Sequence, residues 1–184
     1  KRQNGSIIVT GSIDLTGTRL PELPRFGMRM ELQQSYENLT YYGRGPLENY
    51  IDRYSSSFIG RYEDKVENQF YWYIRPQETG NKTDVRWLAL LNSEGEGVKI
   101  TGLQPIAFSA LHFSPEDLDP GLTRKLQHTI DIVPQKNIFL HVDLKQRGLG
   151  GDNSWGMYPY NKYRLLDKKY VYSYMIELAE KGSD

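Results

Sequence analysis

The sequence has no cysteine in its 184 residues, which excludes disulfide bonds and cysteine-ligated metal centres. Histidine occurs only at positions 112, 128 and 141, without the H-x-H or i, i+4 spacing of a ligand set, and we therefore expect no metal site in this chain. The 23 basic residues are balanced by 23 acidic ones, which argues against nucleic acid as a partner. No apolar run is long enough for a membrane span, so we expect no membrane contact.

The chain also lacks an initiator methionine and a signal-peptide pattern at Lys1. A strand-like run starts at residue 6, so we expect the chain to be part of a larger protein. The absence of cysteine does not decide the compartment, and both a cytoplasmic and a periplasmic location stay open.

Apolar and polar residues alternate along much of the chain, which is typical of half-buried antiparallel strands. Aromatic residues make up 12% of the sequence and favour sheets over disorder. The predicted strands are residues 6–15, 25–33, 69–75, 85–92, 97–101, 106–113, 126–132, 138–145 and 170–178.

Turn signals separate these strands. Residues 114–121 predict one helical turn, with Ser114 as its N-cap and Pro115 at the first helical position. Residues 79–81 and 92–95 have the composition of hairpin turns. Because no repeat, linker or low-complexity segment interrupts the strands, the sequence predicts a single all-β domain over residues 1–184, a large antiparallel β-sandwich.

A glycine-rich loop that ends in a tryptophan is the most distinctive segment, with the sequence G-L-G-G-D-N-S-W at residues 148–155. Glycine allows a tight turn, and Asp152 and Asn153 can hydrogen-bond that turn locally. We interpret Trp155 as an indole held out on a stiff loop, where its flat face can cover the C–H face of a sugar. The alternative is that Trp155 fills the end of a β core, because most tryptophans are largely buried.

A second dense segment covers residues 43–53, with the sequence G-R-G-P-L-E-N-Y-I-D-R, and we call it the Arg-Gly-Pro segment. Its charged side chains are Arg44, Glu48, Asp52 and Arg53. We expect them to pair with one another and hold an irregular loop, with Asn49 as part of the same structural loop. The alternative is that Arg44 or Glu48 meets a ligand.

These segments carry a resemblance to a known family. The Arg-Gly-Pro segment resembles the G-x-G-P-x-E-N-Y-x-D-R signature of the C-terminal domain of bacterial glycoside hydrolase family 2 β-galactosidases. Residues 148–155 are similar to the G-x-G-G-D-x-S-W signature of the same domain. Between them, residues 73–80 resemble its Y-x-x-P-x-E-x-G element.

The resemblance implies a galactose mutarotase-like supersandwich that forms the C-terminal part of a multidomain enzyme. Such enzymes hydrolyse terminal β-D-galactosides with retention, using two glutamates on a (β/α)8 barrel. The resemblance therefore implies no catalytic residue and no cofactor in this chain. Mg²⁺ and Na⁺ would be bound by other domains of the parent enzyme, and the partners would be the barrel, those other domains and a β-galactoside.

Within this domain, the resemblance implies that Trp155 reaches into the pocket of the barrel and packs against substrate. Asp152 and Asn153 would shape and brace the loop, with direct contact to sugar as a second role. This sequence has Asn153 where many family members have an acid, which removes a charge and keeps the capacity to hydrogen-bond.

Two alternatives remain at this point. A stand-alone carbohydrate-binding module could hold sugar on the sheet without a barrel. A mutarotase would need an acid and a base, for which the candidates are His112 or His141 with Glu78 or Asp143. We expect His112 to be a structural hydrogen-bonding residue and His141 to face solvent or the second sheet. The aromatic residues 70–73 and Trp87 are expected to pack in the core.

Overall fold

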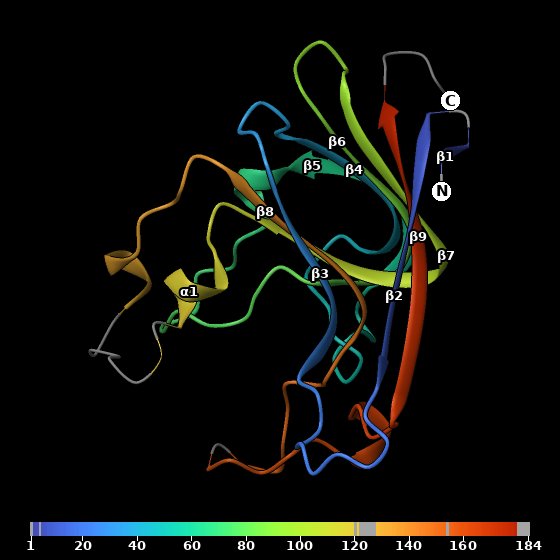
Figure 1. Cartoon of the computed structure of the whole chain (residues 1–184). Helices are drawn as coiled ribbons and strands as arrows, with labels where there is room; N and C mark the ends of the chain where they lie inside the picture. Colours follow the sequence, from blue (N-terminus) through green and yellow to red (C-terminus); the bar gives the residue numbers. More distant parts are fainter. Residues whose placement is uncertain (1, 4, 120, 122–127, 154, 180–184) are drawn as a thin grey trace.

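The computed structural model describes residues 2–3, 5–119, 121, 128–153 and 155–179 (Figure 1). The strands are β1 (Arg2–Gln3), β2 (Ser6–Asp14), β3 (Arg25–Leu32), β4 (Asn38–Gly45), β5 (Phe58–Lys65), β6 (Lys82–Leu91), β7 (Gly97–Leu111), β8 (Ile138–Gln146) and β9 (Lys169–Ala179). The helical elements are η1 (Val66–Asn68), α1 (Pro115–Leu118), η3 (Thr129–Asp131) and η4 (Asn161–Tyr163). No helix in the described part of the chain is long and apolar enough to cross a membrane.

The described strands form one antiparallel sheet with the order β1-β2-β9-β7-β6-β4-β5, and β8 adds β3 through a second pairing with β7. β7 is long enough to belong to two layers. Its first part, up to Gly102, pairs with β9, and its second part, from Ala107, pairs with β8. Gly102 and Pro105 lie between these two parts, where a Cβ on Gly102 would stand 2.3 Å from the Gln104 carbonyl oxygen.

Aromatic side chains of β9 fill the space between the layers. Phe26 of β3 contacts Tyr170 and Tyr172 of β9, with ring centroids 5.7 and 5.5 Å apart, although β3 and β9 are not neighbours in the sheet. The Tyr172 hydroxyl donates a hydrogen bond of 2.9 Å to the carbonyl of Val142 in β8. β2 and β9 therefore face β3 and β8 (Figure 1), and the fold is the all-β sandwich that the sequence predicts.

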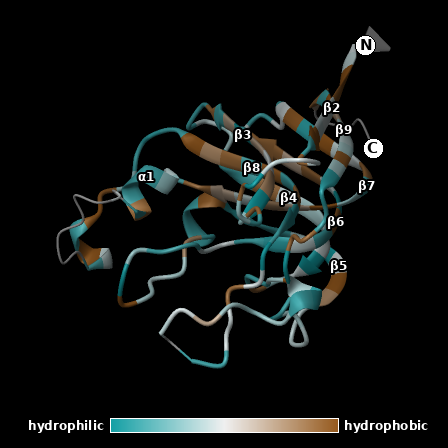
Figure 2. Cartoon of the chain, turned by 60° about the horizontal axis from the view of Figure 1, so that its bottom comes forward, coloured by the Kyte–Doolittle hydropathy of each residue, from teal (hydrophilic) through white to brown (hydrophobic). Residues whose placement is uncertain are grey.

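Two clusters make up the buried core. The larger one joins β4, β6, β7, β8 and β9, and its biggest fully buried side chains include Tyr41, Phe108, Tyr172 and Tyr174. A smaller cluster packs around Phe113 and Leu118, beneath α1. Figure 2 shows the brown, hydrophobic colour concentrated on strands, whereas the loops below them are mostly teal or white. Neither core cluster contains a residue of the segments 46–53 and 147–153, which carry much of the two glycine motifs.

Several expected elements are confirmed. The strands predicted at residues 6–15, 25–33, 85–92, 138–145 and 170–178 correspond to β2, β3, β6, β8 and β9. The helical turn is α1, where Ser114 Oγ accepts from the Asp117 amide at 3.2 Å and the Asp117 carboxylate accepts from the Ser114 amide at 2.7 Å. Residues 92–95 form the hairpin turn between β6 and β7.

Other expectations are wrong. The two strands predicted at residues 97–101 and 106–113 are the single strand β7, and β4 and β5 were not predicted. Residues 69–75 form no strand, because side chains take the place of a sheet partner: the Tyr71 amide donates to Thr79 Oγ1 at 3.1 Å. Residues 79–81 belong to the same irregular segment and not to a hairpin. Residues 128–132 contain η3 in place of a strand, and residues 126 and 127 lie outside the described residues.

Candidate functional site

The Arg-Gly-Pro segment leaves the end of β4 and connects three distant parts of the chain. Glu48 makes the first connection, because its Oε2 accepts from the Gly80 amide at 2.7 Å and from Thr79 Oγ1 at 3.0 Å. Its other oxygen forms an ion pair of 2.6 Å with Arg53 and accepts a hydrogen bond from the Tyr73 hydroxyl. The segment at residues 73–80 is thereby fixed to the Arg-Gly-Pro segment.

Asn49 makes the second connection and is fully buried. Its amide nitrogen donates to the carbonyls of Arg44 and Leu47 at 2.9 and 3.0 Å. Its Oδ1 accepts from both the amide and the hydroxyl of Thr83, at 2.9 and 2.5 Å. The side chain therefore closes the turn after β4 and attaches it to the first residues of β6.

Asp52 makes the third connection, to the loop that follows β8. Its Oδ2 accepts from the Gly150 amide at 2.7 Å. Gly148 packs against the same carboxylate, because a Cβ added there would lie 2.6 Å from Asp52 Cγ. The two glycine motifs, which stand far apart in the sequence, thus meet at Asp52.

The predicted ion-pair network is right in part. Arg53 pairs with Glu48, but Arg44 pairs with Asp84, at 2.8 Å between Nη2 and Oδ2, and also donates to the Ser57 carbonyl at 2.8 Å. Asp52 has its hydrogen bond with a backbone amide and not with an arginine. Asp84 lies on β6 and Gly150 in the loop after β8, and the local pattern of charges could not indicate either partner.

We call residues 147–160 the indole loop; in Figure 1 it extends away from the sheets at the lower edge of the view. The side chain of Trp155 is 92% exposed, and its amide donates to Asn153 Oδ1 at 2.8 Å. The alternative that Trp155 fills a core is therefore wrong, because the Asn153 turn holds the indole outward. Asp152 and Asn153 are exposed beside it, and residue 154 lies outside the described residues.

The base of the indole loop is tied to the sandwich by charge. Glu22 is nearly buried and forms ion pairs with Arg147 at 3.0 Å and with Arg164 at 2.7 Å. Burial acts to raise the pKa of Glu22, but hydrogen bonds from the two arginines outweigh it and lower that pKa. Both guanidinium groups also lie over the ring of Tyr158, 5.3 and 4.6 Å from its centroid. The loop that carries the exposed indole is therefore held at its base by these contacts.

The other singled-out residues differ in outcome. His112 is structural, as expected, because its ring nitrogens contact the Asn137 carbonyl at 3.1 Å and Glu37 at 2.9 Å. Phe70 packs in the core, but Tyr71 and Trp72 are 59% and 58% exposed, so the core packing expected for residues 70–73 is wrong for these two rings. Trp87, expected in the core, is only half-buried, with Lys99 over its ring at 5.5 Å.

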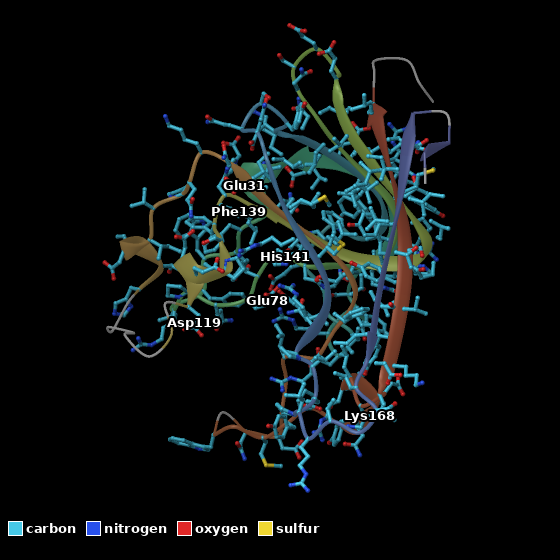
Figure 3. The ribbon with its side chains drawn as sticks, in the orientation of Figure 1. Glu31, Glu78, Asp119, Phe139, His141 and Lys168 are labelled. Atoms are coloured by element: carbon cyan, nitrogen blue, oxygen red, sulfur yellow. The ribbon has the colours of Figure 1, made fainter. Side chains whose placement is uncertain are left out.

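The structure also brings together three of the acid–base candidates. Glu78, His141 and Asp143 surround Arg25, which contacts Glu78 at 3.4 Å and Asp143 at 3.0 Å. In Figure 3, Glu78 and His141 lie between the β3–β8 layer and α1. The sequence offered these residues as separate candidates and gave no sign that an arginine joins them.

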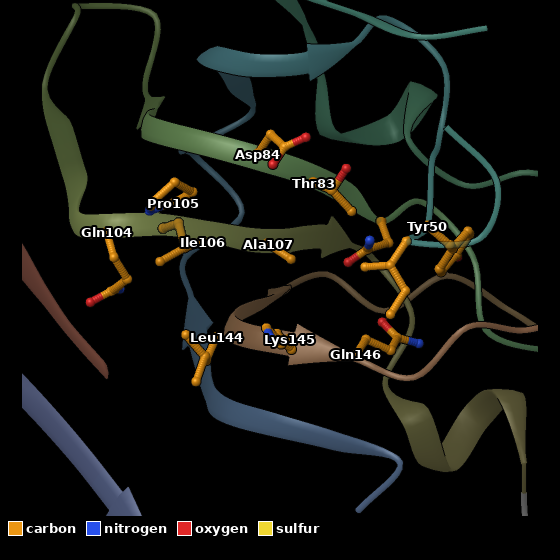
Figure 4. Close-up of a pocket in the computed structure, with 12 residues that line it drawn as sticks. Tyr50, Thr83, Asp84, Gln104, Pro105, Ile106, Ala107, Leu144, Lys145 and Gln146 are labelled. Atoms are coloured by element: carbon orange, nitrogen blue, oxygen red, sulfur yellow. The ribbon is translucent and has the colours of Figure 1, made fainter. Parts of the chain in front are cut away.

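A cavity of about 350 Å³ adjoins the Arg-Gly-Pro segment (Figure 4). It is bounded by Tyr50, by Thr83 of β6, by Ile106 of β7 and by Leu144 of β8. The Tyr50 hydroxyl is buried and has no hydrogen-bond partner among the described residues. Burial and the nearby Glu78 raise the pKa of Tyr50, so that its hydroxyl keeps its proton and remains a donor.

Comparison with known proteins places the chain in a family. The family described as "Beta galactosidase small chain" matches residues 2–176. A beta-galactosidase of Priestia megaterium is 38% identical over 146 residues, which cover 79% of this chain and 14% of that protein. A beta-galactosidase of Streptococcus thermophilus is 33% identical over 175 residues, covering 94% of this chain and 16% of that protein. One from Staphylococcus xylosus is 28% identical over 179 residues, covering 97% and 17%.

The chain therefore spans 14–17% of the length of these relatives, as expected for one part of a larger enzyme. The matched region includes all three motifs, from the Arg-Gly-Pro segment to the indole loop. The family indicated by the three motifs is confirmed: the chain belongs to the beta galactosidase small chain family.

Proposed function

We propose that this chain is the non-catalytic, C-terminal domain of an enzyme that hydrolyses terminal β-D-galactosides with retention. In this proposal, the chain completes the substrate pocket through Trp155, and the two catalytic glutamates belong to a (β/α)8 barrel elsewhere in the parent enzyme. Mg²⁺, and Na⁺ where it is used, would be bound by those other domains. The observation that carries the proposal is an indole that is 92% exposed on a loop with a braced base.

The exposure of Trp155 matters because an indole in water contributes almost no burial energy to its own domain. Its flat face suits the C–H face of a pyranose, and the exposed side chains of Asp152 and Asn153 can reach hydroxyl groups. Three more exposed side chains on the same loop, Met157, Tyr158 and Tyr160, extend this surface. We propose that the surrounding surface rests against the barrel.

The test is Trp155→Ala in the parent enzyme. Loss of an indole that covers one sugar face removes about 50–100 Å² of apolar contact, so KM should rise roughly tenfold and transfer to sugar acceptors should fall. The melting temperature should stay within about 1–2 °C, because Trp155 is almost fully exposed and its indole adds little to the stability of its own domain. Trp72→Ala is the matched control, since Trp72 is also exposed but packs on Phe70 and Phe113. An unchanged KM would overturn the proposal.

The absence of catalytic glutamates is tested separately. The purified 184-residue chain should release no chromophore from a chromogenic β-galactoside. Addition of the remaining domains should restore turnover. Hydrolysis by the purified chain alone would overturn this part of the proposal.

The second candidate is a carbohydrate-binding module, favoured by the same aromatic surface. The sequence suggested a module that holds sugar on the sheet, whereas the exposed aromatic side chains lie on the indole loop. Such a module would hold lactose in the absence of the barrel, and binding through the indole loop would depend on Trp155. Titration of the chain and of its Trp155→Ala variant with lactose separates the two functions.

A further inference from the structure

A second pocket lies beside α1 and β8, and none of its lining residues belongs to the indole loop. It has a volume of about 310 Å³, at the small end of the range for small-molecule sites. Its polar lining includes Arg25, Glu78, Ser109 and His141, and Phe113 and Leu118 contribute an apolar wall. We call it the Arg25 pocket. None of the roles proposed for Trp155 uses it.

His141 is the feature of this pocket that the fold does not explain. The imidazole projects from the middle of β8 and makes no hydrogen bond with another described residue. Burial, followed by the nearby Arg25 and Arg29, lowers its pKa to about 4. The ring is therefore neutral at pH 7, with one nitrogen that donates and one that accepts, and both are free to bind a ligand.

The carboxyl groups of Asp143 and Glu78 have higher pKa values than ordinary surface carboxyl groups. Asp143 is almost completely buried, and burial raises its pKa to about 6 against the opposing effect of Arg25. Burial likewise raises the pKa of Glu78, whose side chain lines the pocket and remains 29% exposed. Arg25 is held by Gln146 Oε1 at 2.8 Å as well as by the two acids. These groups are fixed by one another, and the Glu78 side chain stays partly exposed.

The charges and hydrogen-bonding groups of the pocket lining indicate which class of ligand the pocket can bind. The lining carries two acidic side chains, Glu78 and Asp119, and one arginine, Arg25, and this negative balance disfavours an anion. Within the described residues, no three histidine or acidic side chains are arranged to hold a metal ion. Acceptors, a fixed guanidinium donor and a neutral imidazole beside an apolar wall instead suit the adjacent hydroxyls of a neutral polyol.

We propose that the Arg25 pocket binds one free hexopyranose, through Glu78, Arg25 and His141, independently of the indole loop. A monosaccharide of this size, without an exposed stacking ring, should bind with a Kd of roughly 1–10 mM. The proposal assigns binding only, and no bond is made or broken.

The experiment is an NMR titration of the ¹⁵N-labelled 184-residue chain with D-galactose, and separately with D-glucose and myo-inositol. Saturable shifts are expected for the His141 imidazole and for the amides of Glu78 and Ser109. Glucose and inositol test whether the pocket reads galactose or any neighbouring pair of hydroxyls. Before the titration of a variant is compared with that of the wild-type chain, its spectrum must show the chemical-shift dispersion of a folded protein.

Three variants separate the outcomes. His141→Phe keeps the ring shape and should weaken galactose binding at least fivefold, whereas His141→Gln keeps a donor and an acceptor and should stay within about threefold. Trp155→Ala should leave the affinity unchanged, so failure of the indole proposal and failure of this one are distinguishable. Two results would overturn the proposal that the Arg25 pocket binds sugar. The first is the absence of a saturable shift in the folded chain up to 100 mM sugar, a concentration about tenfold above the weakest expected Kd. The second is a set of shifts that is confined to the indole loop and disappears in Trp155→Ala.

Discussion

Replacement of Asn49 by alanine should be among the most damaging single changes outside the hydrophobic core. The side chain is fully buried and makes four hydrogen bonds: two from its amide to the Arg44 and Leu47 carbonyls, and two to its Oδ1 from Thr83. Each buried group left without a partner costs about 1–3 kcal/mol, and we take the lower bound for the four partner groups of Asn49. We therefore expect a loss of about 4 kcal/mol, a large part of the 5–15 kcal/mol that is typical of a folded domain.

For a chain of this size, 1 kcal/mol shifts the melting temperature by about 2–4 °C, so Asn49→Ala should lower it by roughly 8–16 °C. Thermal unfolding followed by circular dichroism and calorimetry measures the shift. Asn68→Ala is the matched control, because Asn68 is exposed and makes a single side-chain contact, to Asp64 at 2.8 Å. If the two variants melt within 3 °C of each other, less than the shift expected for even 2 kcal/mol, the buried network does not carry the stability assigned to it.

Three further changes test other parts of the structure. Gly27→Ala should prevent folding, or cost more than about 3 kcal/mol, because the new Cβ would lie 2.6 Å from the Asp143 Cα; far-UV circular dichroism measures it. Gly148→Ala should raise the KM of the parent enzyme without touching substrate, since its Cβ would displace the Asp52 carboxylate and the indole loop with it. The lowered pKa of His141 means that its contribution to stability is present above pH 6.5 and is lost as the pH falls toward 4. The raised pKa of Asp143 has the opposite effect over the same range, because protonation of its carboxyl group stabilises the folded chain as the pH falls. The His141 contribution is therefore measured as a difference: between pH 6.5 and 4, urea unfolding should show the stability of the chain falling by up to about 3 kcal/mol relative to that of His141→Gln.

Strands can be predicted from the sequence where apolar residues alternate with polar ones. The prediction fails for β4 and β5, because their positions in the sheet require residues that break this alternation. The inward positions of β4 include Gly43 and Gly45, where a Cβ would lie 2.8 Å from the Val85 Cα and 2.1 Å from the Tyr41 hydroxyl oxygen. Glycine fits there because the neighbours are so close, and it removes the apolar signal. β5 stands at the edge of the sheet and is mostly exposed, so its charged residues protect that edge and do not look like a strand.

Prediction of the candidate site from the sequence has a similar limit. The motifs locate the loops correctly, and their composition indicates that these loops need tight turns and hydrogen bonds. The partners of Arg44 and Asp52, however, are Asp84 and Gly150, which belong to β6 and to the indole loop. Such pairs depend on which strands become neighbours, and a local pattern of charges carries no information about that.

The acidic and amide side chains of the Arg-Gly-Pro segment share one structural role: each holds another part of the chain in place. Glu48 fixes residues 79–80, Asn49 fixes Thr83, and Asp52 fixes Gly150, so three side chains of one short segment hold three different parts of the chain. A loop that must present an exposed side chain gains affinity when its conformation is set before binding, because less ordering entropy is then lost. Of these side chains, Asp52 contacts the indole loop directly, and we propose that it acts on the indole from a distance, through the Gly150 backbone. In a double-mutant cycle, Asp52→Asn combined with Trp155→Ala should raise KM by less than the product of the two single effects, because a displaced indole has already lost part of its contact.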